Sequence, residues 1–260
     1  MNRSSNTAMR ILAFLYGLVN YVIFLGVFLY AIAFVGDFWV PKTIDTGAGG
    51  AFWPSLLINL GLLGLFALQH SGMARPGFKE WWTKIIPEPI ERSTYVLCSN
   101  AVLLLLFWQW RPLSDVLWQV DAAWGQYALW GLFGLGWTLV LLATFMISHV
   151  HLFGLKQVHE HIQGTERSPP DFQTTGFYQY VRHPLNLGFL IAFWATPEMT
   201  VGHLVFALAT TGYIFVAMYL EERDLVARFG ERYREYREHV PMIVPTPTQT
   251  APVESQSQSQ

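Results

Sequence analysis

Long apolar stretches alternate with short polar segments along most of this chain. A helix needs about 20 residues to cross roughly 30 Å of hydrocarbon. Four stretches come close to that length or exceed it, and they are Ile11–Val35, Phe52–Met73, Thr94–Trp110 and Trp124–Ile147. Tryptophans gather near the ends of these stretches, as they do at membrane interfaces. The pattern therefore predicts four transmembrane helices.

A fifth apolar stretch, Leu185–Leu220, is interrupted in its first half. It runs to Trp194, is broken around Pro197, and resumes at about Thr200. The first arm is about ten residues long, which as a helix rises about 15 Å, or half of a bilayer. Proline ends a helix. We therefore expect a re-entrant helical hairpin whose two arms enter and leave the membrane on the same side.

The positions of Lys and Arg favour the same arrangement, because these residues concentrate in cytoplasmic loops. With a cytoplasmic N-terminus, four spans and a returning hairpin, the outer side holds only Lys42 and Arg111 of the 16 Lys and Arg residues. A hairpin that did not return would move further arginines outside, namely Arg223, Arg228, Arg232, Arg234 and Arg237. We expect both termini in the cytoplasm.

Composition supports a membrane protein. The chain is 52% hydrophobic and 13% charged, against about 25% charged in typical soluble domains. We expect an all-α, polytopic fold in which residues 1–245 form one integral-membrane domain. A net charge of −2 argues against a nucleic-acid partner, which needs a basic face. Cys98 is the only cysteine, so no intrachain disulfide is expected, and its apolar neighbours predict a packed thiol.

Two further segments follow the hairpin. Residues 229–240 are amphipathic and rich in Arg and Tyr, which predicts a short helix on the cytoplasmic surface. Residues 246–260 are rich in Ser, Gln, Thr and Pro. Such a composition cannot build a core, so we predict a disordered tail.

Polar side chains that could bind a ligand lie at one end of the predicted spans. Charges at the edge of lipid cost several kcal/mol unless they are paired, which marks them as functional candidates. Carboxylates suit an ammonium group or ribose hydroxyls, and arginine forks onto a carboxylate. This chemistry suits a zwitterionic, purine-bearing cofactor such as S-adenosylmethionine. The groups are Gln69, His70, Ser71, Arg75, Glu91, Arg92, His149, Gln157, Arg182, His183, Glu221 and Glu222.

The last third of the chain resembles the membrane methyltransferases related to isoprenylcysteine carboxyl methyltransferase and the phospholipid methyltransferases. Their shared pattern is Arg-His-Pro, a helical hairpin, a Glu-Glu pair and an F-G-x-x-Y-x-x-Y segment. Here these are residues 182–184, 185–220, 221–222 and 229–236. Asn186 departs from the pattern, since many relatives carry Tyr there, so contacts assigned to that Tyr are not carried over.

The motifs at residues 69–75, 91–93, 152–157 and 200–203 resemble the nurim-like branch of these proteins, over about residues 10–245. Within that branch the chain is similar to bacterial members that methylate methanethiol to dimethyl sulfide. The resemblance implies S-adenosylmethionine as cofactor and a site at the cytoplasmic face of a bacterial inner membrane. The cofactor site it implies is lined by Gln157, Tyr178, Arg182, His183, Glu221 and Glu222.

The thiol chemistry needs further groups. A free thiol with a pKa of roughly 8.5 or above is mostly protonated at neutral pH, so a base or a positive field assists. His70 and His149 are our candidates for the base, and Arg75 or Arg92 for the positive field. His-x-His spacings occur, but without the i,i+4 arrangement of a helical metal pair, so we expect no metal.

Three alternatives remain at this point. The substrate could be a lipid or a prenylated cysteine, the chain could be a non-catalytic nurim-like membrane protein, or its histidines could hold haem. We expect a small-molecule thiol and the lipid bilayer as partners, and we see no sign of an obligate protein partner. The range of thiols is not fixed by the residues.

Overall fold

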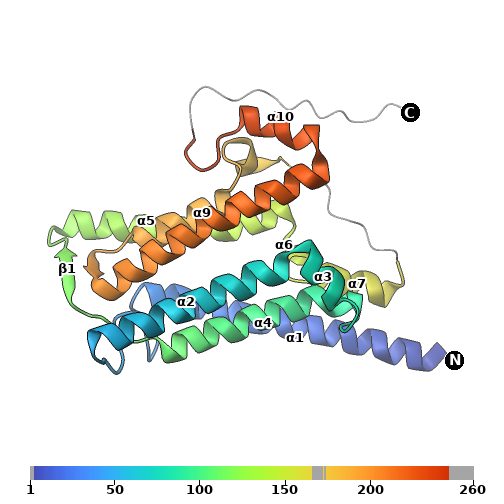
Figure 1. Cartoon of the computed structure of the whole chain (residues 1–260), viewed down its shortest axis with the longest axis horizontal. Coiled ribbons are helices and arrows are strands. Elements are labelled where there is room, and N and C mark those ends of the chain that lie inside the picture. The colour runs from blue at the N-terminus through green and yellow to red at the C-terminus, as the bar shows by residue number, and fades with distance from the viewer. Residues whose placement is uncertain (1–2, 166–171, 173, 246–260) are drawn as a thin grey trace.

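The computed structural model describes residues 3–165, 172 and 174–245, and the tail predicted at 246–260 lies outside this range. Within it, five helices are long and apolar enough to cross a membrane. The long helices run side by side in an elongated bundle (Figure 1). The predicted all-α polytopic membrane fold is confirmed. The five helices are α1 (Arg3–Val35), α2 (Phe52–Ala74), α4 (Glu88–Gln109), α5 (Ala123–Ile147) and α9 (Val201–Phe229).

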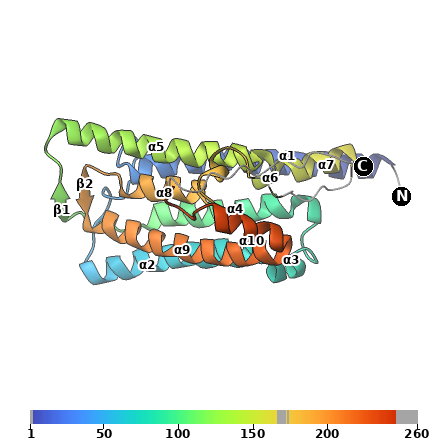
Figure 2. The same cartoon turned by 90° about the horizontal axis from the view of Figure 1, so that it is seen from above.

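Several shorter elements lie near the two ends of the bundle, whereas α8 runs beside α5 within it (Figures 1 and 2). The N-terminus, α3, α7 and α10 are found toward one end, and the strands β1 and β2 toward the other. The predicted amphipathic helix is α10. The shorter elements are α3 (Pro76–Trp82), β1 (Val116–Gln119), α6 (His149–Leu152), α7 (Leu155–Gln163), η1 (Gly176–Gln179), α8 (Pro184–Trp194), β2 (Glu198–Thr200) and α10 (Glu231–His239).

Most predicted helix boundaries agree with the structure within a few residues, but α4 begins at Glu88 and not at Thr94. A proline occupies its first turn together with Glu88 and Glu91. Proline is favoured at the first helical position, and acidic side chains stabilise a helix N-terminus. Hydropathy alone does not detect this polar first turn.

The two arms of the hairpin fold back on each other as expected, but the return arm alone is long and apolar enough to cross a membrane. Its first arm, α8, has 11 residues, whereas its return arm, α9, has 29 and continues past Leu220. Between them β2 pairs antiparallel with β1 of the α4–α5 connection, with Val116 opposite Thr200. An extended strand rises about 3.3 Å per residue, so this segment lengthens the arm that the short helix α8 begins.

The first arm of the hairpin is held tightly against α5. A Cβ atom at Gly136 would lie 2.6 Å from the amide nitrogen of Ala192, and one at Gly188 would lie 2.7 Å from the carbonyl oxygen of Gly136. Small residues let membrane helices approach to backbone contact. This contact fixes α8, and with it the two residues that precede Pro184.

The tip of the hairpin is tied to the loop that follows α1. Thr200 Oγ1 accepts a hydrogen bond from the backbone of His203, which caps α9, and donates one to Asp45 Oδ1 at 2.5 Å. Trp110 Nε1 donates to the carbonyl of Ile44 at 2.9 Å. The end of the bundle opposite α10 is therefore closed by specific polar contacts.

Candidate functional site

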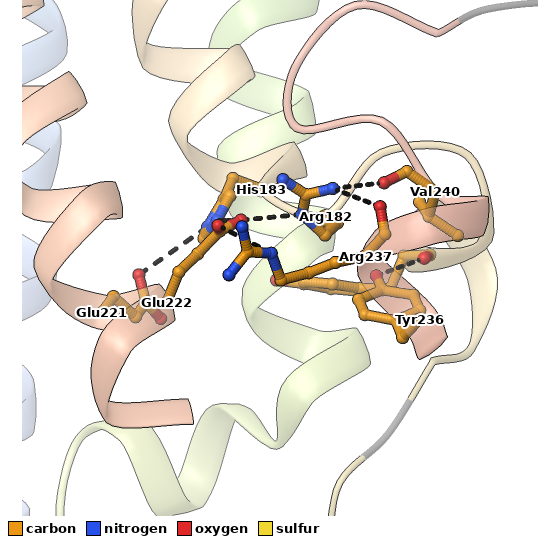
Figure 3. A network of polar contacts seen from close by, with 8 residues as sticks. Arg182, His183, Glu221, Glu222, Tyr236, Arg237 and Val240 are labelled. Carbon is orange, nitrogen blue, oxygen red and sulfur yellow. Dashed lines mark hydrogen bonds and ion pairs between the residues drawn. The ribbon is translucent and has the colours of Figure 1, made fainter. Parts of the chain in front are cut away.

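Arg182 joins three parts of the C-terminal third (Figure 3). It lies between η1 and α8, and its Nε donates to Glu222 Oε1 on α9 at 2.7 Å. Its Nη1 donates to the carbonyl oxygens of Val240 at 2.5 Å and Arg237 at 3.0 Å. The side chain is only 8% exposed. A buried guanidinium with a carboxylate and two carbonyl acceptors is well satisfied, so Arg182 ties α8, α9 and the end of α10 together.

His183 meets both glutamates across the hairpin, as predicted. Its Nε2 lies 3.2 Å from Glu222 Oε1, and its Nδ1 lies 3.7 Å from Glu221 Oε2. The two carboxylates differ in access, because the Glu222 side chain is 5% exposed and that of Glu221 is 55% exposed. Glu222 is thus an internal partner of Arg182 and His183, while the Glu221 carboxylate is open to its surroundings.

The segment after α10 covers this cluster. The backbone amide of Arg182 donates to the carbonyl of Pro241 at 2.9 Å, and that of His183 donates to Met242 at 3.2 Å. Tyr236 donates its hydroxyl hydrogen to the carbonyl of Tyr178 at 2.6 Å. Burial raises the pKa of the Tyr178 phenol, and nearby Glu221 adds to the effect. Tyr178 therefore borders the cluster as a neutral hydroxyl.

His70 lies in a second polar cluster, between α2 and α4. Its Nδ1 is 3.2 Å from Ser99 Oγ, and its Nε2 is 3.0 Å from the Tyr95 hydroxyl. The ring of Phe66 stacks on His70 with centroids 5.1 Å apart. The Arg92 guanidinium lies 4.7 Å from the centre of the Tyr95 ring, which brings a positive charge close to His70.

Arg75 connects the His70 helix to the glutamate helix. Its Nη1 lies 2.9 Å from Asp224 Oδ2, in the turn of α9 that follows Glu221 and Glu222. Its Nε donates to the carbonyl of Ser71 at 3.2 Å. The polar residues that the sequence analysis expected at the cytoplasmic ends of these two helices therefore meet at one end of the α2–α9 contact.

His149 lies apart from these residues, in α6, with both ring nitrogens bonded. Thr144 Oγ1 is 2.8 Å from Nδ1, and the Tyr21 hydroxyl is 2.8 Å from Nε2. Phe145 stacks on the ring with centroids 4.3 Å apart. Burial lowers the pKa of His149. These contacts describe a neutral imidazole that joins α1 to the end of α5.

Gln157 is buried on α7, which packs against α1 and α4. Its Nε2 donates to the carbonyl of His151 at 3.3 Å, whereas its Oε1 has no hydrogen-bond partner among the described residues. None of the hydrogen bonds found for Gln157 in this part of the chain joins it to the Arg182 cluster.

Arg237 belongs to the cluster and was missed by the sequence reasoning. Its Nε lies 3.5 Å from Glu222 Oε2, and its side chain is 44% exposed. It directly follows Tyr236, the last residue of the F-G-x-x-Y-x-x-Y segment. Its place after this segment could have indicated its role. The nine-residue helix α10 begins after Gly230, and its last turn lies over Glu222.

Comparisons with known proteins identify the relatives of this chain. A family model described as "NnrU protein" matches residues 57–240. Methanethiol S-methyltransferase of Mycobacterium tuberculosis is 52% identical over 238 residues, covering 92% of this chain and 98% of that protein. The protein of the same name from Crocosphaera subtropica is 51% identical, covering 93% and 95%. Nurim of Bos taurus is 32% identical over 65% of this chain and 68% of its own. No solved structure matches.

Proposed function

The chain belongs to the NnrU family, and we propose that it is a thiol S-methyltransferase that converts methanethiol to dimethyl sulfide with S-adenosylmethionine as methyl donor. The observation that carries the proposal is similarity over more than nine tenths of the chain to proteins named methanethiol S-methyltransferase. The two polar clusters supply groups of the kinds that this reaction requires.

The donor set at the end of the hairpin fits the cofactor. Glu221, exposed beside His183, suits an ammonium group or ribose hydroxyls. The Arg182 Nε and Nη1 atoms donate to Glu222 and to two carbonyls, so we assign Arg182 and Glu222 the role of holding the site in shape. Arg237, exposed beside Glu222, would bind a ligand carboxylate.

Tyr178 and Gln157 complete the proposed cofactor set. Tyr178 is a neutral hydroxyl close to Glu221. Gln157 brings a buried carbonyl oxygen whose hydrogen-bonding capacity is unmet among the described residues. A buried unmet acceptor costs free energy unless a ligand or water supplies the donor, which is the support for keeping Gln157 in the set.

When bound, S-adenosylmethionine supplies a methyl group on a positively charged sulfur. The residues of this chain would hold the thiol in line with that bond and exclude water. We assign His70 as the acceptor of the thiol proton, and Arg75 and Arg92 as the positive charges that stabilise the thiolate. The thiolate held by these residues would form the new S–C bond with its electron pair, and the bound cofactor would take up the electron pair of the bond that breaks.

We further propose that the protein lies in the inner membrane of a bacterium, with the bundle end that carries α3, α7 and α10 on the cytoplasmic side. The support is the distribution of positive charge, since only Lys42 and Arg111 fall in the loops near the strand end. The partners are then a small thiol and the bilayer.

Headspace analysis tests the activity directly. Membranes containing the chain are supplied with S-adenosylmethionine and methanethiol, and dimethyl sulfide is measured by gas chromatography. We expect product from the unmodified chain and from Arg234→Lys, whose exposed pair with Glu231 lies on the outside of α10. Glu221→Gln should lose most of the product. A chain that makes none, while present in the membrane and folded, would overturn the proposal.

A further inference from the structure

Tyr213 forms the polar contact between α2 and α9 inside the bundle. Its hydroxyl lies 3.1 Å from Ser71 Oγ. Its ring packs edge-on against Phe66, with centroids 6.1 Å apart. Both Ser71 and Tyr213 are half-buried.

This pair lies between the two polar clusters described above. On the α2 side, Ser71 follows His70 directly, and Phe66 contacts both the His70 ring and the Tyr213 ring. On the α9 side, Tyr213 precedes Glu221 by eight residues, or about 12 Å of helix rise. Arg75 Nε donates to the carbonyl of Ser71 at 3.2 Å, which places a positive charge beside this pair.

Side-chain size changes sharply along the face of α9 that carries Tyr213 and Glu221. Positions 213, 217 and 221 follow each other at four-residue spacing and therefore share one face of the helix. Ala217 is the middle member of this series, between Tyr213 and Glu221. Alanine projects less from the helix than the ring and the carboxylate on either side of it, which suits a substrate of a few heavy atoms.

We propose that Tyr213 and Phe66 form the wall of the thiol subsite and set the size of thiol that the chain accepts, with the Ser71 hydroxyl holding the Tyr213 ring in place. This proposal rests on the proposed function, because it assumes that the methyl group moves from the Glu221 side toward the His70 side. Methanethiol, with one carbon, fits against the wall, and each further methylene of a longer thiol meets the Tyr213 ring.

The test is a panel of methanethiol, ethanethiol and 1-propanethiol with S-adenosylmethionine, measured as the volatile sulfide products. One methylene in a fitted pocket is worth about 10- to 200-fold in kcat/KM. We expect Tyr213→Ala to raise the ratio of propanethiol to methanethiol kcat/KM by about tenfold or more. Tyr213→Phe keeps the ring and should keep the ratio of the unmodified chain.

Tyr219→Ala is the matched control, because Tyr219 lies on the same helix and is 62% exposed on the outside of the bundle. An unchanged ratio in Tyr213→Ala, or an equal change in Tyr219→Ala, would overturn the inference. If Tyr213→Ala does not accumulate in membranes, Tyr213→Val makes the same comparison. Failure of the unmodified chain to methylate any thiol is a different result, which counts against the proposed function itself.

Discussion

Glu222 accepts a hydrogen bond from Arg182 Nε at 2.7 Å, although 40 residues separate them. Both side chains are almost fully buried. Glu221, the next residue, turns its carboxylate outward and stays half exposed. Adjacent glutamates in a helix differ by about 100° in direction, so one closes the hairpin internally while the other points outward, where we propose that it meets the cofactor. This difference leads to a prediction that separates the two roles.

Glu222→Gln should destabilise the fold, whereas Glu221→Gln should weaken cofactor binding at unchanged stability. Removing one partner of a buried ion pair costs about 3–5 kcal/mol, because the other charge is left uncompensated. Thermal unfolding of the detergent-purified protein measures the first effect, and calorimetry with S-adenosylhomocysteine measures the second. Equal effects of the two substitutions in both measurements would contradict the assignment.

Glu231→Gln provides the control for charge removal alone. Glu231 pairs with Arg234 at 2.9 Å, but the two side chains are 72% and 56% exposed. Exposed pairs of this kind contribute about 0–1 kcal/mol. We expect neither the unfolding temperature nor the binding of S-adenosylhomocysteine to change measurably.

Gly188→Ala should loosen the first arm of the hairpin. The added methyl would lie 2.7 Å from the carbonyl oxygen of Gly136 and 2.8 Å from the amide nitrogen of Val140. Backbone atoms cannot rotate away, so α8 must move, and such overpacking costs about 1–3 kcal/mol. We expect a lower unfolding temperature together with weaker cofactor binding, because Arg182 and His183 directly precede α8.

Gly131→Ala on α5 is the matched substitution, since a Cβ there meets nothing within 4 Å. Alanine is favoured over glycine in a helix by up to about 1 kcal/mol, so this variant should be as stable as the unmodified chain or more so. If both glycine variants unfold at the same temperature, the close contact between α5 and α8 is not what holds the hairpin.

Hydropathy was sufficient to predict most of this fold, because each long helix must cover about 30 Å of hydrocarbon. Hydropathy predicted that α9 ends at Leu220, because the charged residues 221–224 resemble the end of a span. The helix instead continues to Phe229. Hydropathy also gave no sign of β1 and β2. Strands of four and three residues are too short to show the alternation that identifies a strand.

The site was predictable where both partners are charged side chains. Arg182, His183, Glu221 and Glu222 flank an apolar hairpin, so their meeting followed from the hairpin returning. The other acceptors of Arg182 are the carbonyls of Arg237 and Val240. A backbone carbonyl belongs to every residue and leaves no signature in the sequence, so the closing role of the segment after α10 could be found only from the structure.

Asp45 should make stability depend on pH. Burial raises the pKa of this carboxyl from 3.8 to about 6. The hydrogen bond from Thr200 lowers this pKa in part, and the negative charges of Asp37 and Glu198 raise it further. The folded pKa exceeds the unfolded one, so this stabilising contribution is complete below about pH 4 and is lost as pH rises through 6. Asp45→Asn should therefore be more stable at pH 7.5, by on the order of 3 kcal/mol, and nearly equal at pH 4.

Unfolding temperatures of the two proteins across that pH range measure the difference. Asp121→Asn, in the connection that follows β1, is the control and should run parallel to the unmodified chain at every pH. A constant gap between Asp45→Asn and the unmodified chain would show that the carboxylate charge is not what the folded state disfavours.

The pH–rate profiles of His70 and His149 variants should show which histidine is the general base. General-base catalysis contributes about 10²- to 10⁴-fold, so we expect His70→Gln to lower kcat/KM for methanethiol by at least about 10² at neutral pH. Its rate should then rise in proportion to the thiolate as pH increases. His149→Gln removes an imidazole held by Thr144 and Tyr21; it should lower the unfolding temperature and keep the shape of the profile. Should His149→Gln instead acquire the rising profile while His70→Gln keeps that of the unmodified chain, the base is His149, and its bonds to Thr144 and Tyr21 must open during turnover.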